Sequence, residues 1–546
     1  MTTAPASICL ELDVAIPGAS YSNPETHGVR PHGVAYGLLP GLPVSETLNA
    51  SDAGYVTLST DAGGVVAYPP LLAQGLAIQR GMNLVPGAAA AAAGWGTLSL
   101  MNLGGRFNAY SLSRNSDGRP LRLYRARMIY DSARGYYTSP AKASRTLLFA
   151  GLSGPWALSE ATLDIPARDG SYWLERPLQS TLYAGTGLLE GGADLTGKPK
   201  PKARGGTNSY PILNVPAVLV DATHLIYQYS DAPGTVVQVY EGGNAGFTAG
   251  ADVADLYTGS TTAGTYRTNN ARGLFQLGST PTRTITADVT GQFASAGAQT
   301  SLLNIARYLL AEDCALPSAN LDTSSFTSLA ATYPYTAGVW FDTNPVQCVD
   351  AVNTVLSAAG LQLLPLRSGV LSVMALRAPS ASYTARLDTT NIVTLKARAL
   401  PPQLYPPAFR AGAGYQRSYL VQTSDISPSI TAARKTLVAT QDRTAMWVDT
   451  NVASNWKRPN DLLPVGGALQ VLADAQAVAN AYGALWGVTR RLYDITVPLD
   501  TAAALDLGQV VQVVYPAADL TNGKPGLIVG ETLNTFDATS ILQVLV

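Results

Sequence analysis

The stretch Leu182-Tyr-Ala-Gly-Thr-Gly-Leu-Leu-Glu-Gly-Gly-Ala-Asp-Leu-Thr-Gly-Lys-Pro-Lys-Pro201 decides how the chain is divided. It holds too many glycines and prolines for a regular helix or strand. It leads directly into the apolar segments Tyr210-Pro-Ile-Leu-Asn-Val-Pro-Ala-Val-Leu-Val-Asp221 and Leu225-Ile-Tyr-Gln-Tyr-Ser-Asp231. We therefore predict an irregular connector over residues 181–247, between folded regions on either side.

The composition indicates a large protein with little surface charge. A chain of 546 residues is long enough for three or four domains. Charged residues make up 13% of it, against a usual share of about 25%, and the net charge is −1. Either the surface is uncharged, as in some monomeric β proteins, or much of it is covered by partners, because interface cores are depleted of charge. A dedicated nucleic-acid binder would carry a basic surplus, so we do not expect one.

The sequence predicts neither a membrane span nor a secretion signal. No apolar run reaches the roughly 18 residues that a spanning helix needs, and the longest weakly polar run, residues 86–101, includes six consecutive alanines (Ala88 to Ala93). The start, Met1-Thr-Thr-Ala-Pro-Ala-Ser, has no basic region before an apolar segment. We expect the chain to be made and folded in a cytoplasm.

The first half of the chain is typical of short strands separated by turns. Residues 1–50 include Pro17, Pro24, Pro31, Pro40 and Pro43 and are interpreted as an N-terminal extension that could attach a partner. Residues 51–180 show alternating segments such as Tyr55-Val-Thr-Leu-Ser-Thr, with turn pairs at Asp117-Gly118 and Asp169-Gly170. This pattern predicts a first β-barrel or sandwich domain at 51–180. The connector, with further hairpins, fills 181–280.

Helical periodicity appears after residue 280. One apolar stripe runs over 299–313, and a second helix is predicted to start at Asn344-Pro345, with Asn as N-cap, and to end at Gly360. Segments 361–366 and 370–376 flank the turn Arg367-Ser-Gly and predict a hairpin. Together they predict a small α+β domain at 281–378.

The last region, 379–546, is predicted to be a second β-barrel domain with one long helix at 469–486. Four strand-like segments close the chain, and Asn522-Gly523 between two of them is a hairpin turn. The predicted fold class is therefore mainly β and multidomain, with a small α+β domain and barrel or sandwich domains.

A search for catalytic or metal-binding patterns yields no site. The three histidines, His27, His32 and His224, form no metal-ligand motif, so no metal is predicted. No nucleophile elbow or phosphate loop is present, and the glycines of 187–192 precede coil rather than a helix. The three cysteines, Cys9, Cys314 and Cys348, are widely spaced and predicted to be buried reduced thiols.

A sugar-cleaving enzyme would need two carboxylates facing each other across a cleft. The candidates by proximity in sequence are Asp164, Asp169, Glu175 and Glu190, which we interpret as surface or capping groups. We therefore predict no catalytic, cofactor-binding or metal-binding residue, no cofactor, and no enzyme activity. Tyrosine is abundant, at 27 residues against 9 Phe and 7 Trp, which suits protein interfaces, sugar platforms and β-sheets alike.

Several segments of this sequence resemble tail hub proteins, the baseplate hub or central tail tip proteins of tailed bacteriophages and gene transfer agents. The resemblance covers about residue 50 to the end and leaves the first 50 residues unmatched. The alanine run stands where a Gly-rich stretch is expected. The segments that carry the resemblance are Tyr55-Val-Thr-Leu-Ser-Thr-Asp-Ala-Gly-Gly, Gly96-Thr-Leu-Ser-Leu-Met-Asn, Asp117-Gly-Arg-Pro-Leu-Arg-Leu, Leu182-Tyr-Ala-Gly through Gly197-Lys-Pro-Lys-Pro, Ile212-Leu-Asn-Val-Pro-Ala, Leu225-Ile-Tyr-Gln, Ala503-Ala-Leu-Asp-Leu-Gly-Gln-Val-Val and Asn522-Gly-Lys-Pro-Gly-Leu-Ile-Val-Gly-Glu.

The resemblance implies a structural virion protein that forms a homotrimer. Two β-barrel domains per chain would form a pseudo-sixfold ring that joins the sixfold tail tube or distal tail protein to a threefold central fibre or spike. The ring would enclose the channel through which DNA and the tape-measure protein leave, without sequence-specific binding. The implied location is the tail tip or baseplate of the virion, after assembly in the bacterial host cytoplasm.

Two other interpretations remain open. A receptor-binding or polysaccharide-degrading tail spike would show long β-helical repeats and convergent acids, which the sequence lacks. A secreted β-rich adhesin would be expected to start with a signal peptide.

Overall fold

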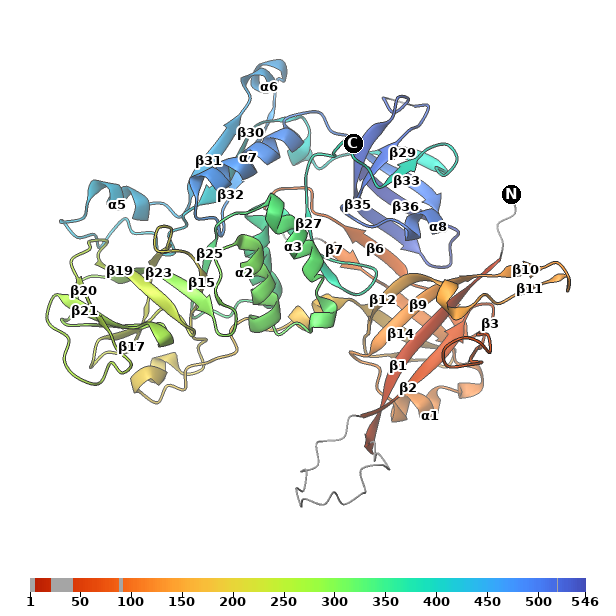
Figure 1. Ribbon diagram of the computed structural model, residues 1–546, viewed down its shortest axis with the longest axis horizontal. Helices are drawn as coiled ribbons and strands as arrows, with labels where there is room; N and C mark the ends of the chain where they lie inside the picture. The colour runs from red at the N-terminus through yellow and green to blue at the C-terminus, as the bar shows by residue number, and fades with distance from the viewer. Residues whose placement is uncertain (1–4, 21–42, 88–91, 518) are drawn as a thin grey trace.

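The computed structural model describes residues 5–20, 43–87, 92–517 and 519–546. It confirms the predicted fold class, because the chain is mainly β with a small helical region. Figure 1 shows an elongated molecule with two curved sheets at one end, a helical region in the middle and further sheets at the other end. Most of the alanine run, residues 88–91, and the histidines at 27 and 32 lie outside the described residues. Among the described helices, none is long and apolar enough to cross a membrane.

The first curved sheet is built around the N-terminal strand. Its antiparallel order is β2 (Pro43–Ser51), β1 (Ala6–Ser20), β9 (Pro120–Arg127), β12 (Thr146–Ser153), β14 (Thr162–Arg168), β8 (Thr97–Met101) and β5 (Leu72–Gln74), with β13 (Ala157–Leu158) on β14. Leucines on its inner face, including Leu10, Leu98 and Leu123, form one buried core. Alternating leucines thus explain why these segments form one half-buried sheet.

The predicted boundary at residue 50, between an N-terminal extension and the first β domain, does not coincide with the edge of this sheet. Leu10 on β1 pairs with Ala50 on β2 and with Leu123 on β9, so β1 lies inside the sheet and is not part of a separate extension. The sequence of β1 does alternate, with Ile8, Leu10, Leu12 and Val14 in one buried core and polar residues such as Asp13 between them, so a strand signal was present that the prediction of an extension overlooked. Pro17 and Pro43 fall near the outer ends of β1 and β2, where proline is tolerated.

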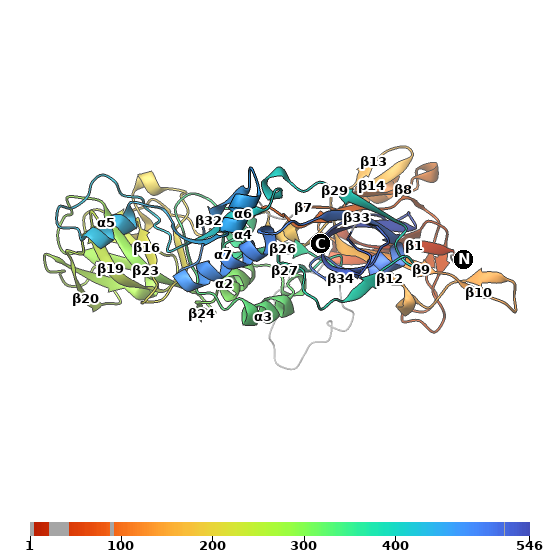
Figure 2. The ribbon, with the colours of Figure 1, turned by 90° about the horizontal axis from the view of Figure 1, so that it is seen from above.

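A hairpin from the first part of the chain joins the last curved sheet. The last sheet has the order β28 (Ala385–Leu387), β34 (Val510–Val513), β35 (Lys524–Asn534), β36 (Thr539–Leu545), β33 (Leu492–Pro498) and β29 (Thr394–Arg398). Strand β6 (Ala77–Gly81) pairs with β35 and carries β7 (Ala92–Gly94) on its other side. Figure 2 looks down this sheet, which curls around its interior. The two curved sheets are therefore tied together by strand pairing.

The connector is shorter than predicted, because residues 202–247 contain five strands. Only 181–201 is irregular, with short turns at η5 (Leu188–Glu190) and η6 (Ala193–Leu195). One sheet has the order β16 (Ile212–Val215), β23 (Ile285–Phe293), β15 (Lys202–Gly205) and β25 (Gly338–Phe341), with β19 (Gly234–Glu241) and β24 (Gly297–Ala298) on β23. A second has the order β17 (Val218–Asp221), β18 (Ile226–Gln228), β22 (Leu274–Leu277), β21 (Thr265–Asn269) and β20 (Thr248–Asp252). The four residues of β15 and of β16 are all buried, so neither strand shows alternation.

The approach of β15 to β23 leaves no room for a side chain at Gly291. A Cβ built there would lie 2.1 Å from the backbone carbonyl carbon of Ala203. We expect Gly291→Ala to lower the free energy of unfolding by about 1–3 kcal/mol, because the two strands must move apart. Unfolding in urea measures this change in the free energy of unfolding. Gly81→Ala is the matched control, since its Cβ would meet its nearest atom at an ordinary 3.7 Å; equal effects of the two substitutions would refute the prediction.

The helical region lies between the two ends of the molecule. It contains α2 (Leu302–Tyr308), which widens into a π turn over Leu309–Asp313, then α3 (Thr323–Thr332), α4 (Cys348–Ser357) and the predicted hairpin of β26 (Leu361–Pro365) and β27 (Leu371–Ala375). The predicted helix start at Asn344-Pro345 is wrong, because α4 begins at Cys348 with Gln347 as N-cap. Residue Val346 instead accepts a hydrogen bond from Leu178 N and donates one to Gln179 Oε1, which keeps this segment extended.

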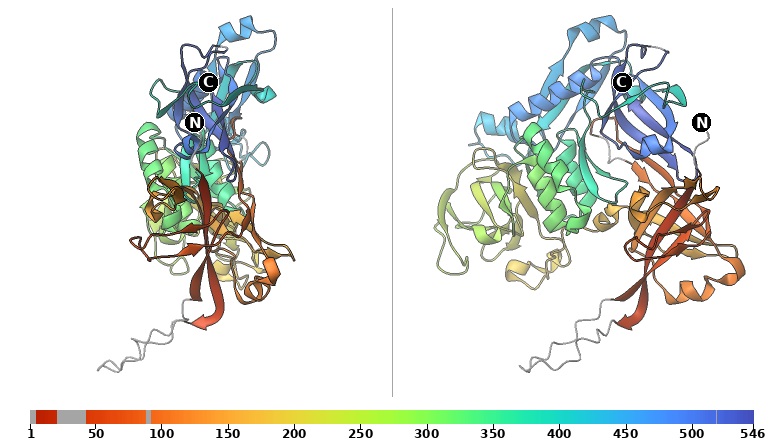
Figure 3. Two further views of the ribbon diagram at one scale, coloured as in Figure 1. Left: turned by 90° about the vertical axis from the view of Figure 1, so that its right-hand side faces the viewer. Right: turned by 45° about the vertical axis from the view of Figure 1, so that its right-hand side comes forward.

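A three-stranded sheet and the long helix complete the fold. Strands β31 (Arg443–Val448), β30 (Ala408–Tyr415) and β32 (Asn460–Val465) are covered by α7 (Leu472–Trp486), close to the predicted 469–486. Gly483 of α7 packs against the ring of Trp447 on β31. Short helices α5 (Ala432–Val438) and α6 (Thr450–Asn455) connect the three strands, whereas α8 (Leu499–Ala503) follows β33 in the last curved sheet. Figure 3 shows this layer above the helical region.

Candidate functional site

A buried charge cluster lies where the two curved sheets meet. Arg80 on β6 donates to Glu531 on β35 through Nη2 at 2.5 Å and Nε at 3.2 Å, and its Nη2 lies 2.8 Å from Asp506 Oδ1. Arg367, in the β26–β27 turn, reaches Glu531 Oε1 at 3.2 Å and donates to the Ala502 carbonyl at 3.0 Å. Side chains of Arg80 and Glu531 are almost fully buried. Burial alone would lower the pKa of Arg80, but Asp506 and Glu531 outweigh it and raise that pKa. Arg80 therefore stays charged, and the cluster joins three parts of the chain.

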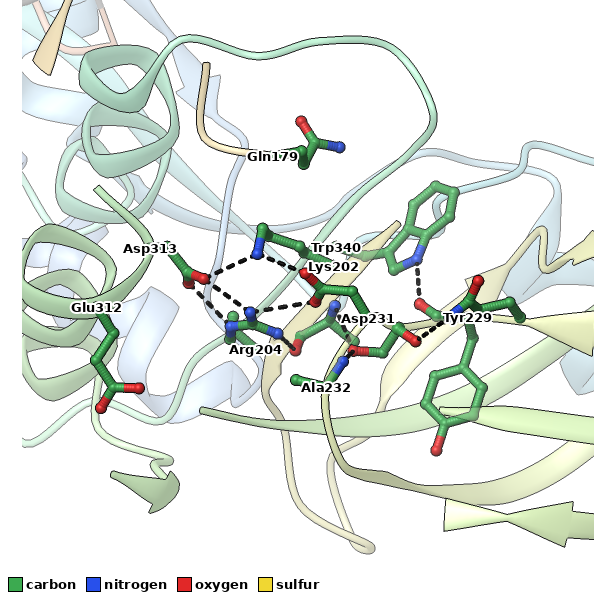
Figure 4. A network of polar contacts seen from close by, with 12 residues as sticks. Gln179, Lys202, Arg204, Tyr229, Asp231, Ala232, Glu312, Asp313 and Trp340 are labelled. Carbon is green, nitrogen blue, oxygen red and sulfur yellow. Dashed lines mark hydrogen bonds and ion pairs between the residues drawn. The ribbon is translucent and has the colours of Figure 1, made fainter. Parts of the chain in front are cut away.

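A second buried cluster joins β15 to the turn after α2 (Figure 4). Arg204 forms a forked pair with Asp313, with Nε–Oδ2 at 3.0 Å and Nη2–Oδ1 at 2.8 Å. Lys202 Nζ lies 2.6 Å from Asp231 Oδ2 and 3.0 Å from Asp313 Oδ1. Asp231 also accepts from Arg204 Nη2 at 3.3 Å. Lys202 and Arg204 thus each contact both Asp231 and Asp313.

The geometry of this cluster is suited to stabilising the packing around β15 rather than to catalysis. Lys202 and Arg204 are two residues apart on one strand, so their side chains leave the same face of β15. Near it, Trp340 on β25 donates from Nε1 to the Tyr229 carbonyl at 2.9 Å (Figure 4). Burial opposes ionisation of Asp313, yet Arg204 and Lys202 outweigh it and keep its pKa below the usual value. All four charges are compensated inside the cluster, so none is free to act on a substrate.

The depressed pKa of Asp313 predicts a loss of stability in acid. Because its pKa is lower in the folded chain than the unfolded value of about 4, its stabilising contribution is fully present above pH 4 and is lost as the pH falls through the folded pKa. We expect the free energy of unfolding, measured in urea from pH 7 down to pH 3, to fall less steeply in Asp313→Asn than in the wild type. Identical slopes below pH 4 would contradict this role.

A third cluster fixes α5 to the sheet of β16 and β23. Arg434 donates from Nη1 and Nη2 to Asp288 at 2.7 and 2.9 Å, and its guanidinium lies 3.7 Å from the ring centre of Tyr240. Asp288 also accepts from the backbone N–H of Asn214 at 2.8 Å. The close cation–ring contact and the forked ion pair together hold a short helix that has little apolar surface of its own.

The four carboxylates considered as sugar-cleaving candidates serve separate local roles. Asp169 accepts from Trp95 Nε1 and caps the turn at Ser171. Glu175 pairs with Arg168 at 3.3 Å, and Glu190 pairs with Lys200 at 2.7 Å. Asp164 lies on β14 opposite Ser99. Asp169 therefore caps a turn while also binding the distant Trp95, and Glu175 and Glu190 form ion pairs with residues nearby in the sequence.

His224 and the cysteines also have structural surroundings. The ring of His224 lies 2.8 Å from Asp221 Oδ2, which also accepts from Tyr257 Oη at 3.1 Å. In the part of the chain that the structure describes, no three metal-ligating side chains gather. Cys9, Cys314 and Cys348 are buried and unbridged, as predicted, and burial raises the pKa of the Cys9 thiol to about 12.

One hairpin with several exposed large apolar side chains was not predicted from the sequence. Strands β10 (Ile129–Asp131) and β11 (Tyr136–Thr138) pair only with each other, and Tyr130 stacks edge-on against Tyr137 at 5.2 Å. Figure 1 shows the hairpin projecting from the end that carries both curved sheets. The signal was present as two β-prone triplets, Ile129-Tyr-Asp and Tyr136-Tyr-Thr, around a turn ending in Gly135.

Neither a protein-family model nor a curated relative matches this chain. Solved structures with some likeness include a tail protein from Neisseria meningitidis MC58, 12% identical with a TM-score of 0.36, covering 90% of this chain and 96% of that one. A 43 kDa tail protein of prophage MuSo2 from Shewanella oneidensis is 10% identical with a TM-score of 0.32, covering 90% and 97%. A chain of a native gene transfer agent particle is 13% identical with a TM-score of 0.36, covering 69% and 92%. At these values none of them decides the fold or function of this chain.

Proposed function

We propose that this chain is the hub of a bacteriophage tail tip or baseplate, a structural virion protein that acts by assembly and catalyses no reaction. Three copies form a ring around an axial channel. The ring joins the tail tube or a distal tail protein to a central fibre or spike, and DNA and the tape-measure protein pass through the channel during genome ejection. This function rests on the sequence resemblance together with one observation from the structure.

The observation that carries the proposal is the pairing of two curved sheets in one chain. Strand β6, from the first part of the chain, pairs with β35 near the C-terminus, and Arg80 and Glu531 lie opposite each other in this pairing. Removing either charge would leave the other buried without this partner, so the pairing of β6 with β35 is costly to break. A chain that holds two such sheets at one end supplies two similar units, and three copies supply six.

The scarcity of charge supports assembly as the function. Part of the charge that the chain does have lies in the buried clusters of Arg80, Arg204 and Arg434 and does not reach the surface. Surfaces that are covered by partners need few charges and favour tyrosine, which is the main aromatic residue here. A channel for DNA also works best without a surplus of positive charge, and the net charge is −1.

An electron-microscopy reconstruction of tail tips from particles that contain this chain tests the proposal. We expect three copies in a closed ring, with an open axial channel whose lining is poor in Arg and Lys. A single copy per particle, or a ring without a channel, would count against the hub.

The polysaccharide-degrading spike is tested separately with the purified chain and envelope glycans of the host. We expect no released product, because Asp169, Glu175 and Glu190 are held by their own local partners. Sustained product release would replace the hub with an enzymatic function.

A further inference from the structure

Cys314 and Cys348 lie in contact with each other inside the helical region. Cys314 follows the π turn after α2, and Cys348 is the first residue of α4. The helix α4 packs against that turn, and both cysteines belong to the same buried core. The two thiols are hydrogen-bonded to each other. Because a disulfide requires neighbouring sulfur atoms, this contact is the starting arrangement for one.

A guanidinium group lies beside one of the two thiols. Pro177 and Gln347 form an isolated antiparallel bridge, and Cys348 N donates to the Arg176 carbonyl at 3.0 Å. Arg176 and Cys348 therefore lie opposite each other next to this bridge, and residues in that relation carry their side chains on the same side. The Arg176 side chain donates a hydrogen bond to the sulfur of Cys348.

These contacts make Cys348 the more nucleophilic of the two thiols. The hydrogen bond from Cys314 is the main cause that lowers the pKa of Cys348, and Arg176 adds to it against the effect of burial. The same hydrogen bond, together with burial, raises the pKa of Cys314. Cys348 also begins a ten-residue helix, whose dipole favours a thiolate at this end. Asp313 opposes the thiolate, but its charge is already compensated in the buried cluster.

A cavity of about 900 Å³ lies next to the pair. Its lining includes Arg176, which contacts Cys348, and also Asp313 and Ala315, the neighbours of Cys314 in the sequence. Both sulfur atoms are themselves buried. The cavity therefore brings a small oxidant close to the thiols, whereas a bulky reagent is kept away from them.

We propose that Cys314 and Cys348 are a redox pair that hydrogen peroxide converts into a disulfide, with Cys348 as the attacking sulfur. The Cys348 thiolate attacks one peroxide oxygen, the O–O bond breaks, and a sulfenic acid and a hydroxide ion form. The Cys314 thiol then attacks the Cys348 sulfur, so that the S–S bond forms and the S–O bond breaks. The departing oxygen leaves as water with the thiol proton. The two sulfur atoms lose two electrons in total, and the peroxide gains them.

The disulfide would clamp three segments together. The turn that ends at Cys314 also carries Asp313 of the buried cluster, and Cys348 is hydrogen-bonded to the start of the connector at Arg176. A bond between the two sulfurs closes a loop over residues 314–348, which restricts the unfolded chain and so stabilises the folded one. Oxidation therefore tightens the contact between the connector and the helical region.

The first test uses the wild-type full-length chain. It is treated with millimolar hydrogen peroxide and denatured, the remaining thiols are alkylated, and peptides are mapped by mass spectrometry without reductant. We expect a peptide pair linked through Cys314 and Cys348 and lighter by two hydrogen atoms. Cys9 is the internal control and should stay alkylated, since burial raises its pKa to about 12. Two free thiols after treatment, a sulfinic acid at Cys348 in place of the disulfide, or linkage to Cys9 would each overturn the inference.

The second test assigns the attacking sulfur. In Cys314→Ala, dimedone should trap a sulfenic acid at Cys348. Arg176→Gln should slow disulfide formation by roughly tenfold, because less of Cys348 is thiolate. The matched control is Lys198→Gln, which removes another cation from the lining of the same cavity and should leave the rate unchanged. Equal rates in the two variants, or no dimedone adduct, would overturn the inference.

The third test measures the clamp. Oxidation should raise the midpoint of unfolding in urea, and dithiothreitol should reverse the shift. The double variant Cys314→Ala/Cys348→Ala should show no shift on peroxide treatment. An unchanged or lower midpoint in wild-type protein that carries the disulfide would overturn the clamp. All three tests use the single chain in solution, so their outcome does not depend on the proposed hub.

Discussion

Glu531→Ala is expected to lower the free energy of unfolding by about 3–5 kcal/mol, because it leaves two buried guanidinium groups without their shared carboxylate. Arg80 would keep Asp506 as its one carboxylate, together with the Pro365 carbonyl, and Arg367 would keep only backbone carbonyls. The cluster spans β6, β35 and the β26–β27 turn, so the loss weakens the contact between the two curved sheets directly. Urea unfolding at pH 7 measures the effect.

Two controls define what this result means. Glu160→Ala removes an exposed carboxylate of the first curved sheet and should change the free energy of unfolding by less than about 0.5 kcal/mol. The triple variant Arg80→Met/Arg367→Met/Glu531→Leu removes the three most buried charges of the cluster and leaves Asp506, which is partly exposed. It should recover most of the loss, because an apolar set can replace a buried ion cluster. If Glu531→Ala lowers the free energy of unfolding by less than about 1 kcal/mol, the contact between the two curved sheets does not depend on this charge.

Asp313→Ala is expected to cost a similar amount, about 3–5 kcal/mol, since Lys202 and Arg204 then share the single carboxylate of Asp231. This substitution weakens the contact between β15 and the turn that follows α2, because Asp313 is the residue of that turn that binds Arg204. Thermal unfolding should report a lower midpoint, and limited proteolysis should cut first near residues 181–201.

The matched control for this change is Asp537→Ala, an exposed aspartate in the β35–β36 turn. It should leave both the midpoint and the cleavage pattern unchanged. Equal effects of Asp313→Ala and Asp537→Ala would contradict the view that the buried cluster holds the connector in place.

Local patterns in the sequence predict several elements correctly. The helix predicted at 469–486 is α7, and the segments around Arg367-Ser-Gly form the hairpin of β26 and β27. The four strand-like segments predicted at the end of the chain are β33, β34, β35 and β36. Gly523 has a φ of +78°, as its place in the turn before β35 requires. In each case the deciding residues are neighbours in the sequence, so local preference and final structure agree.

Non-local pairing accounts for the errors. Strand β1 is fixed by partners on β2 and β9, and β6 is fixed by β35, so neither placement follows from nearby residues. Asn344 and Pro345 look like a helix start, but pairing with residues 177–179 keeps that segment extended. Tertiary contacts override local preference in these places.

The buried charges could not be recognised in advance for the same reason. Lys202 and Arg204 continue a run of Lys and Pro that resembles an exposed linker, and their partners Asp231 and Asp313 lie 29 and 109 residues further on. Their spacing of two residues on one strand face is the only local hint. The projecting tyrosine hairpin, in contrast, was readable from its two triplets and the glycine between them.

The most direct test of the central claim is the mass of the purified full-length chain in solution at micromolar concentration, measured by multi-angle light scattering. Assembly as a ring of three predicts a particle of three times 57.0 kDa. A mass of 57.0 kDa that persists at every concentration and salt would contradict it.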